Sequence, residues 1–402
     1  MNGKMLSDRI LNLKESATIK MTQYSQELKA QGIDIINLSI GEPDFNTPSH
    51  VKNAAKQAID NNITHYSPVP GFNELRQAIA DKLKRDNGLL YEMNQIVVSN
   101  GAKQALANVL LSVINPEDEV IVPAPYWVSY PDMIRLALGK VVLLETTIQQ
   151  DFKIKPEQIE AVITPKTKVF LLNSPSNPSG TVYTEEELAG FARLFEKYPD
   201  ILVVSDEIYE HINYKGKHHS IAAFNNMKDR VVVINGVSKA FAMTGWRIGY
   251  MAAPLWLANA CIKLQGQLTS GAGSISQMAA LDAMTLLPER SEFLKEMINA
   301  FRERRDVTFN LLNQIEGIKT NLPEGAFYLF PNVSFYFGKS DGVTTIHNST
   351  DLCFYLLDKA HVALVPGEAF GHPTCVRLSY ATDKKRLVEA MQRIKGVLKM
   401  LA

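Results

Sequence analysis

The sequence has few cysteines and no long apolar run. Its 402 residues include only Cys261, Cys353 and Cys375, which lie far apart and lack the spacing of metal ligands. An odd number of cysteines fits a reducing compartment better than a disulfide scaffold. No stretch approaches the roughly 18 apolar residues of a membrane helix, and the N-terminus lacks the apolar core of a signal peptide. We therefore expect a cytoplasmic protein without membrane contact.

The sequence also lacks an excess of either charge. Forty-two Lys and Arg balance 42 Asp and Glu, so nothing attracts the chain as a whole to nucleic acid or anionic lipid. The richest basic run, Arg302, Arg304 and Arg305, lies in a helical pattern and predicts a solvated helix face. The adjacent His218 and His219 predict a surface pair rather than a metal site. We predict no nucleic-acid partner and no metal.

What is present is a core-forming composition with an α/β rhythm. Apolar residues make up 46% of the chain, and its length predicts two or three domains at about 100 to 200 residues each. Between about residues 95 and 255, longer amphipathic stretches alternate with short β-rich runs, which is typical of an α/β fold. The runs cover 95–98, 119–122, 141–145, 168–172, 201–205 and 230–234. Most end in polar or Gly/Pro-rich segments, which we expect to converge on one site at the carboxyl ends of the strands.

The rhythm changes in the C-terminal part. A helical pattern covers about 285–318. Beyond Gly317, the pattern predicts a strand at 326–330, a helix at 351–360, two further strands and a terminal helix from Asp383. This order predicts a second domain of the α+β class.

The strongest chemical signal lies at 237–250, where Lys239 follows a predicted strand and Arg247 comes eight residues later. A lysine in this position is usually a solvated amine. Beside a fixed positive charge in a cleft, however, its pKa tends to be lowered and it can form a Schiff base. A carbonyl cofactor such as pyridoxal phosphate would also need a phosphate site, an acid for its pyridinium nitrogen and donors to its phenolic oxygen.

The segments after the other strands offer candidates for these roles. Asp206 ends a predicted strand, where it pairs with a cation such as a pyridinium or, equally well, caps a helix. The turn at 99–104 either cradles a phosphate or simply links a strand to a helix. Asn177, in the Pro-rich segment 173–180, favours a site loop over a plain turn. Trp127 stacks on a planar ligand or packs in the core.

Eight segments then occur together in one order: SIGEPDFNTP, HYSPVPGFNELR, APYWVSYPDM, NSPSNPSG, VSDEIYEH, SKAFAMTGWRIGY, PEGAFY and VRLSYAT. By these segments the chain resembles the class I, fold-type I pyridoxal-phosphate aminotransferases. The most similar subgroup is that of the bacterial aspartate and aspartate/prephenate aminotransferases, from about Lys14 onward. The resemblance implies a large cofactor domain at 48–320, with a mostly parallel seven-stranded sheet between helices. It also implies a smaller α+β domain from 1–47 and 321–402.

The resemblance implies roles for individual residues. Lys239 would be the Schiff-base lysine and proton shuttle, and Asp206 would pair with the pyridinium nitrogen. Tyr209 and Asn177 would bond the phenolic oxygen, and Trp127 would stack on the ring. The phosphate would be held by Arg247, by the turn of Gly101, Ala102 and Lys103, and by Tyr66 of the other subunit, because the family's active site lies at a homodimer interface.

Substrate contacts follow from the resemblance in part. Arg377 would bind the α-carboxylate by a two-pronged contact, near the backbone of Gly41. Without the resemblance, a structural ion pair would be the better interpretation of Arg377. The segment 265–280 has no arginine for a distal carboxylate, so the candidates are Lys14, Thr18 and Lys103. Glu15 stands where the subgroup usually has proline.

The resemblance implies a ping-pong transamination between L-aspartate and 2-oxoglutarate, with prephenate as a further acceptor that gives L-arogenate. The substrates would be amino acids and 2-oxo acids. Alternatives on the same fold are a C–S β-lyase and an aromatic or other aminotransferase. A regulator that binds pyridoxal phosphate without turnover is disfavoured, because such proteins carry an added DNA-binding domain and the resemblance begins almost at the first residue.

Overall fold

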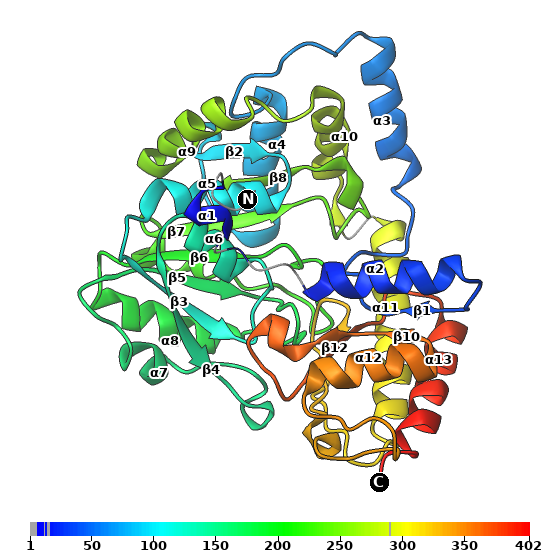
Figure 1. The fold of residues 1–402 in the computed structure, drawn as a ribbon. Helices are drawn as coiled ribbons and strands as arrows, with labels where there is room; N and C mark the ends of the chain where they lie inside the picture. The colour runs from blue at the N-terminus through cyan, green and yellow to red at the C-terminus, as the bar shows by residue number, and fades with distance from the viewer. Residues whose placement is uncertain (1–5, 12, 14–16, 289–290) are drawn as a thin grey trace.

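The computed structural model describes residues 6–11, 13, 17–288 and 291–402, and for residues 17–20 it describes the backbone alone. Seven strands form the central sheet (Figure 1). They are β2 (Ile96–Ser99), β3 (Glu119–Ala124), β4 (Lys140–Glu145), β5 (Thr167–Asn173), β6 (Leu202–Asp206), β7 (Val231–Gly236) and β8 (Gly249–Ala252). Their spatial order is β2-β8-β7-β6-β5-β3-β4, and only β8 runs antiparallel to its neighbours. The mostly parallel sheet confirms the α/β prediction.

Helices cover both faces of this sheet, as the strand sequences require. Neighbouring residues of a strand point to opposite faces, so buried Val203 packs in one core cluster and buried Val204 in another. The first cluster includes α4 (Asn73–Lys82) and α8 (Glu185–Glu196), with α3 (Ser49–Asp60) and α10 (Ser274–Thr285) packed beyond α4. The second includes α5 (Ala102–Val113), α6 (Tyr130–Leu136) and α9 (Leu255–Leu268). The helices α1 (Asp8–Leu11) and α7 (Pro156–Glu160) are short, and α7 contacts α8.

The second part of the molecule joins both ends of the chain. Strand β1 (Ile36–Asn37) pairs in parallel with β10 (Val362–Ala363), and β11 (Val365–Pro366), β12 (Val376–Ser379) and β9 (Tyr328–Leu329) form an antiparallel sheet. Around them lie α2 (Ala17–Ala30), α11 (Glu292–Leu312), α12 (Ser349–Ala360) and α13 (Lys384–Leu398) (Figure 1). The α+β character is as predicted, while the domain boundaries at 48 and 320 stay a prediction.

Several local expectations need correction. The helical pattern predicted over 285–318 forms α11 over Glu292–Leu312 alone. The side chains of Arg304 and Arg305 are only 14% and 12% exposed, because Arg304 pairs with Asp44 at 2.7 Å and Arg305 lies over the ring of Tyr214. The predicted solvated face is therefore wrong for these two arginines.

The predicted surface histidine pair is also wrong, because the side chain of His218 is 6% exposed and bonds Glu207 at 2.9 Å. The three cysteines are buried free thiols. Among the helices of the described ranges, none is long and apolar enough to span a membrane.

Candidate active site

A pocket of about 460 Å³ opens at the carboxyl ends of β5, β6 and β7 and is closed on one side by β9 and β12. Its position follows from the parallel topology, because the strand ends gather their polar segments at one edge of the sheet. The pocket brings together most of the residues predicted from sequence: Gly41, Ala102, Lys103, Trp127, Asn177, Asp206, Tyr209, Lys239, Arg247 and Arg377.

Lys239 lies three residues after the end of β7 and reaches into the pocket. Its Nζ donates to the carbonyl oxygen of Gly41 at 2.7 Å and lies 5.8 Å from the ring centroid of Tyr209. Burial lowers the pKa of Lys239 to about 8, with Arg377 and Arg247 acting in the same direction and Glu42 opposing them. A substantial fraction of this amine is therefore neutral near physiological pH, as a nucleophile requires.

Asp206 is the last residue of β6 and is 6% exposed. The hydroxyl of Tyr130 donates to its Oδ2 at 2.6 Å, and the amide of Ile208 donates to its Oδ1 at 3.3 Å. Burial raises the pKa of Asp206 to about 6 despite these two bonds. No helix begins after β6 before residue 221, so the alternative of a helix cap is wrong. The carboxylate instead faces the pocket.

The turn before α5 lies against Arg247. Gly101 has φ +85, and a Cβ there would overlap the guanidinium of Arg247. Arg247 itself has φ +58, and its Nη1 donates to the carbonyl of Thr244 at 2.9 Å. The close approach brings a guanidinium to the N-terminus of α5, where free amides and the helix dipole favour an anion. Gly236, three residues before Lys239, also has no room for a side chain, because a Cβ there would lie 2.8 Å from Cα of Gly249.

Lys103 lies at the rim of this region. Its Nζ is 4.9 Å from the ring centroid of Trp127, a distance at which a cation interacts with an aromatic face. Partial burial, together with the charge of Arg247, lowers the pKa of Lys103. Trp127 packs edge-on against Tyr130 with the ring centroids 5.4 Å apart, and it both lies against the second core cluster and lines the pocket.

Arg377 is buried at 4% exposure in the middle of β12. Its Nη1 donates to Oδ1 of Asn177 at 3.0 Å, its Nη2 donates to the carbonyl of Ser39 at 2.7 Å, and its Nε has no partner. No carboxylate of the described residues lies within ion-pair distance of it, so the alternative of a structural ion pair is wrong. The backbone of Asn177 is fixed in turn, because its backbone N–H donates to Oδ1 of Asn173 at 2.8 Å.

Four predicted residues lie outside this pocket or outside the described side chains. Gly101 does not line the pocket, although it directly precedes Ala102, which does. Tyr66 is 99% exposed and does not line the pocket. Lys14 falls outside the described residues, and Thr18 lies in α2, where only the backbone is described. Sequence reasoning missed Tyr130 and Tyr328, which line the pocket, although both stand inside quoted motifs.

The residues present fit pyridoxal phosphate. Asp206 offers a buried carboxylate with no Lys, Arg or His of the described chain at ion-pair distance, which suits a protonated ring nitrogen. Arg247 and the start of α5 offer an anion site for the phosphate. Lys239 offers an amine of lowered pKa for the carbonyl carbon.

Known proteins agree with this chemistry. The family model described as Aminotransferase class I and II matches residues 33–394. The bifunctional aspartate aminotransferase and glutamate/aspartate-prephenate aminotransferase of Petunia hybrida is 49% identical over 98% of this chain and 82% of its own length. The aspartate/prephenate aminotransferase of Nitrosomonas europaea is 47% identical over 98% of this chain and 99% of its own.

Solved structures share the whole fold. The aspartate aminotransferase from Rhizobium meliloti superposes with a TM-score of 0.95 at 42% identity, covering 99% of both chains. The aspartate aminotransferase from Thermus thermophilus with maleate has a TM-score of 0.92 at 41% identity, covering 98% of this chain and 99% of that one. These matches confirm the predicted fold type and cofactor. The chain belongs to the class I and II aminotransferase family and is a pyridoxal-phosphate-dependent enzyme that acts on amino acids and 2-oxo acids.

Proposed function

We propose that this enzyme transfers the amino group of L-aspartate to 2-oxoglutarate, giving oxaloacetate and L-glutamate, with prephenate as a further acceptor that gives L-arogenate. The observation that carries the proposal is Arg377, a buried guanidinium bonded to two neutral oxygens and, in the described part of the chain, to no acid. A buried cation needs an anionic partner, and every amino acid and 2-oxo acid supplies an α-carboxylate.

A second cation supports an acidic substrate. Lys103 stands over Trp127 at the pocket, where it is free to bind the distal carboxylate of a dicarboxylic substrate. No arginine occurs at 265–280 to take that role. Lys14 and Thr18 remain further candidates for the same contact. The aspartate and aspartate/prephenate names of relatives that are 42–49% identical to the chain support this substrate class.

Lys239 is the proposed catalytic residue. The bound cofactor supplies a carbonyl group and an electron-withdrawing ring. Lys239 would hold the carbonyl carbon of the cofactor through its Nζ, and with a substrate bound the freed Nζ would accept the proton from the substrate's α-carbon. Asp206 holds the proton of the ring nitrogen, because its carboxylate is buried and otherwise lacks a cation. Tyr209 and Asn177 donate to the phenolic oxygen.

The remaining contacts position the cofactor and the substrate. Arg247 and the backbone of Gly101 and Ala102 bind the phosphate, and Trp127 stacks on the ring. Gly41 contributes its backbone beside the α-carboxylate, which Arg377 binds by two parallel hydrogen bonds.

A donor and acceptor panel tests the substrate proposal. Purified protein loaded with pyridoxal phosphate is assayed with aspartate, glutamate, aromatic and aliphatic amino acids, against 2-oxoglutarate, oxaloacetate and prephenate. We expect the highest kcat/KM for aspartate and glutamate. Turnover of aromatic or aliphatic donors while aspartate and glutamate remain inert would refute the proposal. Release of pyruvate and ammonia without any acceptor would identify a β-lyase instead.

We also propose that the protein is cytoplasmic and forms a homodimer with shared active sites. The 99% exposure of Tyr66 supports the shared active site. Tyr66 then reaches the phosphate bound by the other subunit. Mixed refolding of Lys239→Ala with Tyr66→Ala chains tests this, because one site of each hybrid dimer has both side chains intact. We expect activity well above that of either parent variant. A monomer in light scattering, or no gain on mixing, would refute the shared site.

A further inference from the structure

Tyr328 lies at the meeting point of the two parts of the pocket. It begins β9 in the smaller sheet, is fully buried, and lines the pocket together with residues that follow β6 and β7. Its side chain contacts Tyr209 through the hydroxyl and Arg377 through the ring.

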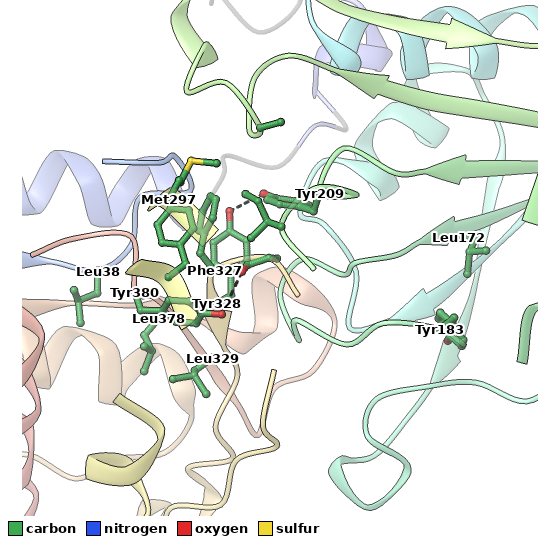
Figure 2. Packing of buried hydrophobic residues seen from close by; sticks show 14 of the residues in the cluster. Leu38, Leu172, Tyr183, Tyr209, Met297, Phe327, Tyr328, Leu329, Leu378 and Tyr380 are labelled. Carbon is green, nitrogen blue, oxygen red and sulfur yellow. Dashed lines mark hydrogen bonds between the residues drawn. The ribbon is translucent and has the colours of Figure 1, made fainter. Parts of the chain in front are cut away.

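The hydroxyl of Tyr328 lies 2.8 Å from the hydroxyl of Tyr209, and Figure 2 shows the bond between them. The two rings meet edge to face with centroids 5.9 Å apart, so the hydroxyl contact is held by ring packing as well. Tyr209 follows β6 by three residues and lines the same pocket. A phenol has one proton, so the direction of the Tyr209 hydroxyl depends on what its oxygen accepts.

The ring face of Tyr328 packs on Arg377. The guanidinium carbon lies 4.6 Å from the centroid of the Tyr328 ring and 4.9 Å from that of Phe370. The two strands that carry Tyr328 and Arg377 pair directly, with Tyr328 opposite Ser379. Two aromatic faces thus fix the plane of a guanidinium whose Nε has no hydrogen-bond partner.

The same hydroxyl also requires glycine at residue 41. A Cβ on Gly41 would lie 2.8 Å from the hydroxyl oxygen of Tyr328, closer than carbon and oxygen can pack. The carbonyl of Gly41 is the acceptor for Nζ of Lys239. Tyr328 therefore lies against the backbone that holds the lysine.

We propose that Tyr328 is a positioning residue with two separable actions. Its hydroxyl donates to the oxygen of Tyr209 and so leaves the proton of Tyr209 free to point into the pocket, toward the phenolic oxygen of the cofactor. Its ring holds the guanidinium of Arg377 in the plane that receives the substrate's α-carboxylate. The inference rests on the function proposed above for this site.

The test compares Tyr328→Phe, which keeps the ring, with Tyr328→Leu, which loses both groups. In Tyr328→Phe, kcat falls about tenfold or less, the typical effect of one hydrogen bond. The pH midpoint of the cofactor's absorbance change moves upward, because weaker donation from Tyr209 stabilises the anionic phenolic oxygen less. The dissociation constant of maleate, measured by calorimetry, stays within about twofold because the ring remains.

In Tyr328→Leu, the pH midpoint moves in the same way and the maleate dissociation constant also rises, about tenfold. Tyr355→Phe is the matched control, because it removes a buried ring's hydroxyl, which bonds Asp341 at 3.2 Å, away from the pocket. We expect no change in that control. Circular dichroism and the cofactor content of each variant confirm folding.

Two results would overturn the inference. An unmoved pH midpoint in Tyr328→Phe would show that the hydroxyl does not act through Tyr209. Equal weakening of maleate binding in both variants would show that the ring does not act on Arg377 separately. Wild-type turnover of aspartate is measured in parallel, so that a wrong substrate assignment is distinguished from a wrong role for Tyr328.

Discussion

Two buried ionic clusters flank the end of β6, and they differ in how their charges are balanced. Asp206 faces the active-site pocket, while the next residue, Glu207, is 1% exposed and faces a cluster enclosed by protein. In that enclosed cluster, Lys82 pairs with Glu210, and His218 bonds Glu207 at 2.9 Å. Asp206, Lys239 and Arg377, by contrast, form no ion pair with any side chain of the described residues.

The difference is visible in the direction of the pKa shifts. In the enclosed cluster, Lys82 and His211 hold the pKa of Glu210 well below its usual value although burial opposes them. Glu207 raises the pKa of His218, also against the effect of burial. In the pocket, burial prevails and shifts the pKa of Asp206 up and that of Lys239 down. Buried charges that the protein leaves unpaired therefore mark where a charged ligand binds.

The same comparison bears on metal binding. Potential ligand atoms of Glu207, Glu210 and His218 lie within 4.8 Å of one another. The ammonium of Lys82, which is 2% exposed, already supplies the positive charge there by pairing with Glu210. The enclosed cluster is thus a structural unit completed by its own lysine.

The largest expected effect is the loss of the pocket's amine. Lys239→Ala should lower kcat/KM for aspartate by about 10⁴-fold or more, because both carbonyl capture and proton transfer are lost. The visible absorbance of lysine-bound cofactor should disappear from the dialysed variant. Retention of that absorbance would rule out Lys239 as the attachment site. Lys263→Ala, on an outer helix, is the control and should leave both quantities unchanged.

The next effect concerns the unpaired guanidinium. Arg377→Lys keeps the charge but loses the two-pronged contact, at about 2 to 3 kcal/mol, or roughly 30- to 150-fold in kcat/KM. The loss should appear for every amino acid donor, since all carry an α-carboxylate. Steady-state kinetics with aspartate and with alanine measure it. A loss confined to aspartate would instead assign Arg377 to the distal carboxylate.

The enclosed cluster should respond in stability alone. Glu210→Gln leaves the ammonium of Lys82 buried without its acid, which should cost about 3 kcal/mol in the free energy of unfolding by urea. The kcat of the folded variant should remain that of the wild type. Glu292→Gln removes a surface partner of Lys295 as a matched control, and its unfolding midpoint should not move. A fall in kcat without a fall in stability would contradict the division between the clusters.

The sequence predicted much of this arrangement. All six β-rich runs became strands, because each is a continuous apolar segment bounded by turn residues. Strand β8 was missed, since Gly249–Ala252 is short, begins with glycine and directly follows the Arg247 motif. The motif residues predicted the pocket, because the ends of parallel strands meet at one edge of a sheet.

Residues whose roles depend on contacts across the chain could not be predicted. His218 was expected at the surface, because adjacency to His219 does not reveal that its loop turns inward toward Glu207. Tyr130 and Tyr328 are two of 14 tyrosines, and the motifs that contain them do not show which of their side chains line the pocket. Only the fold shows that Tyr130 donates to Asp206 at 2.6 Å and Tyr328 contacts Tyr209 at 2.8 Å.

The smallest expected effect is a pH dependence of the pocket lysine. Because its pKa is lowered to about 8, half of Lys239 is neutral at that pH, whereas an ordinary lysine with a pKa near 10.4 is almost entirely charged. Only the neutral amine attacks a carbonyl. The rate constant for capture of pyridoxal phosphate by the apoenzyme should therefore rise about tenfold per pH unit below 8 and level off above it. Stopped-flow absorbance between pH 7 and 10 measures this rate while the phosphate, with a second pKa near 6, stays dianionic. A rate that keeps rising to pH 10 would show an ordinary lysine, and the pocket would then lack the uncompensated burial that separates it from the enclosed cluster.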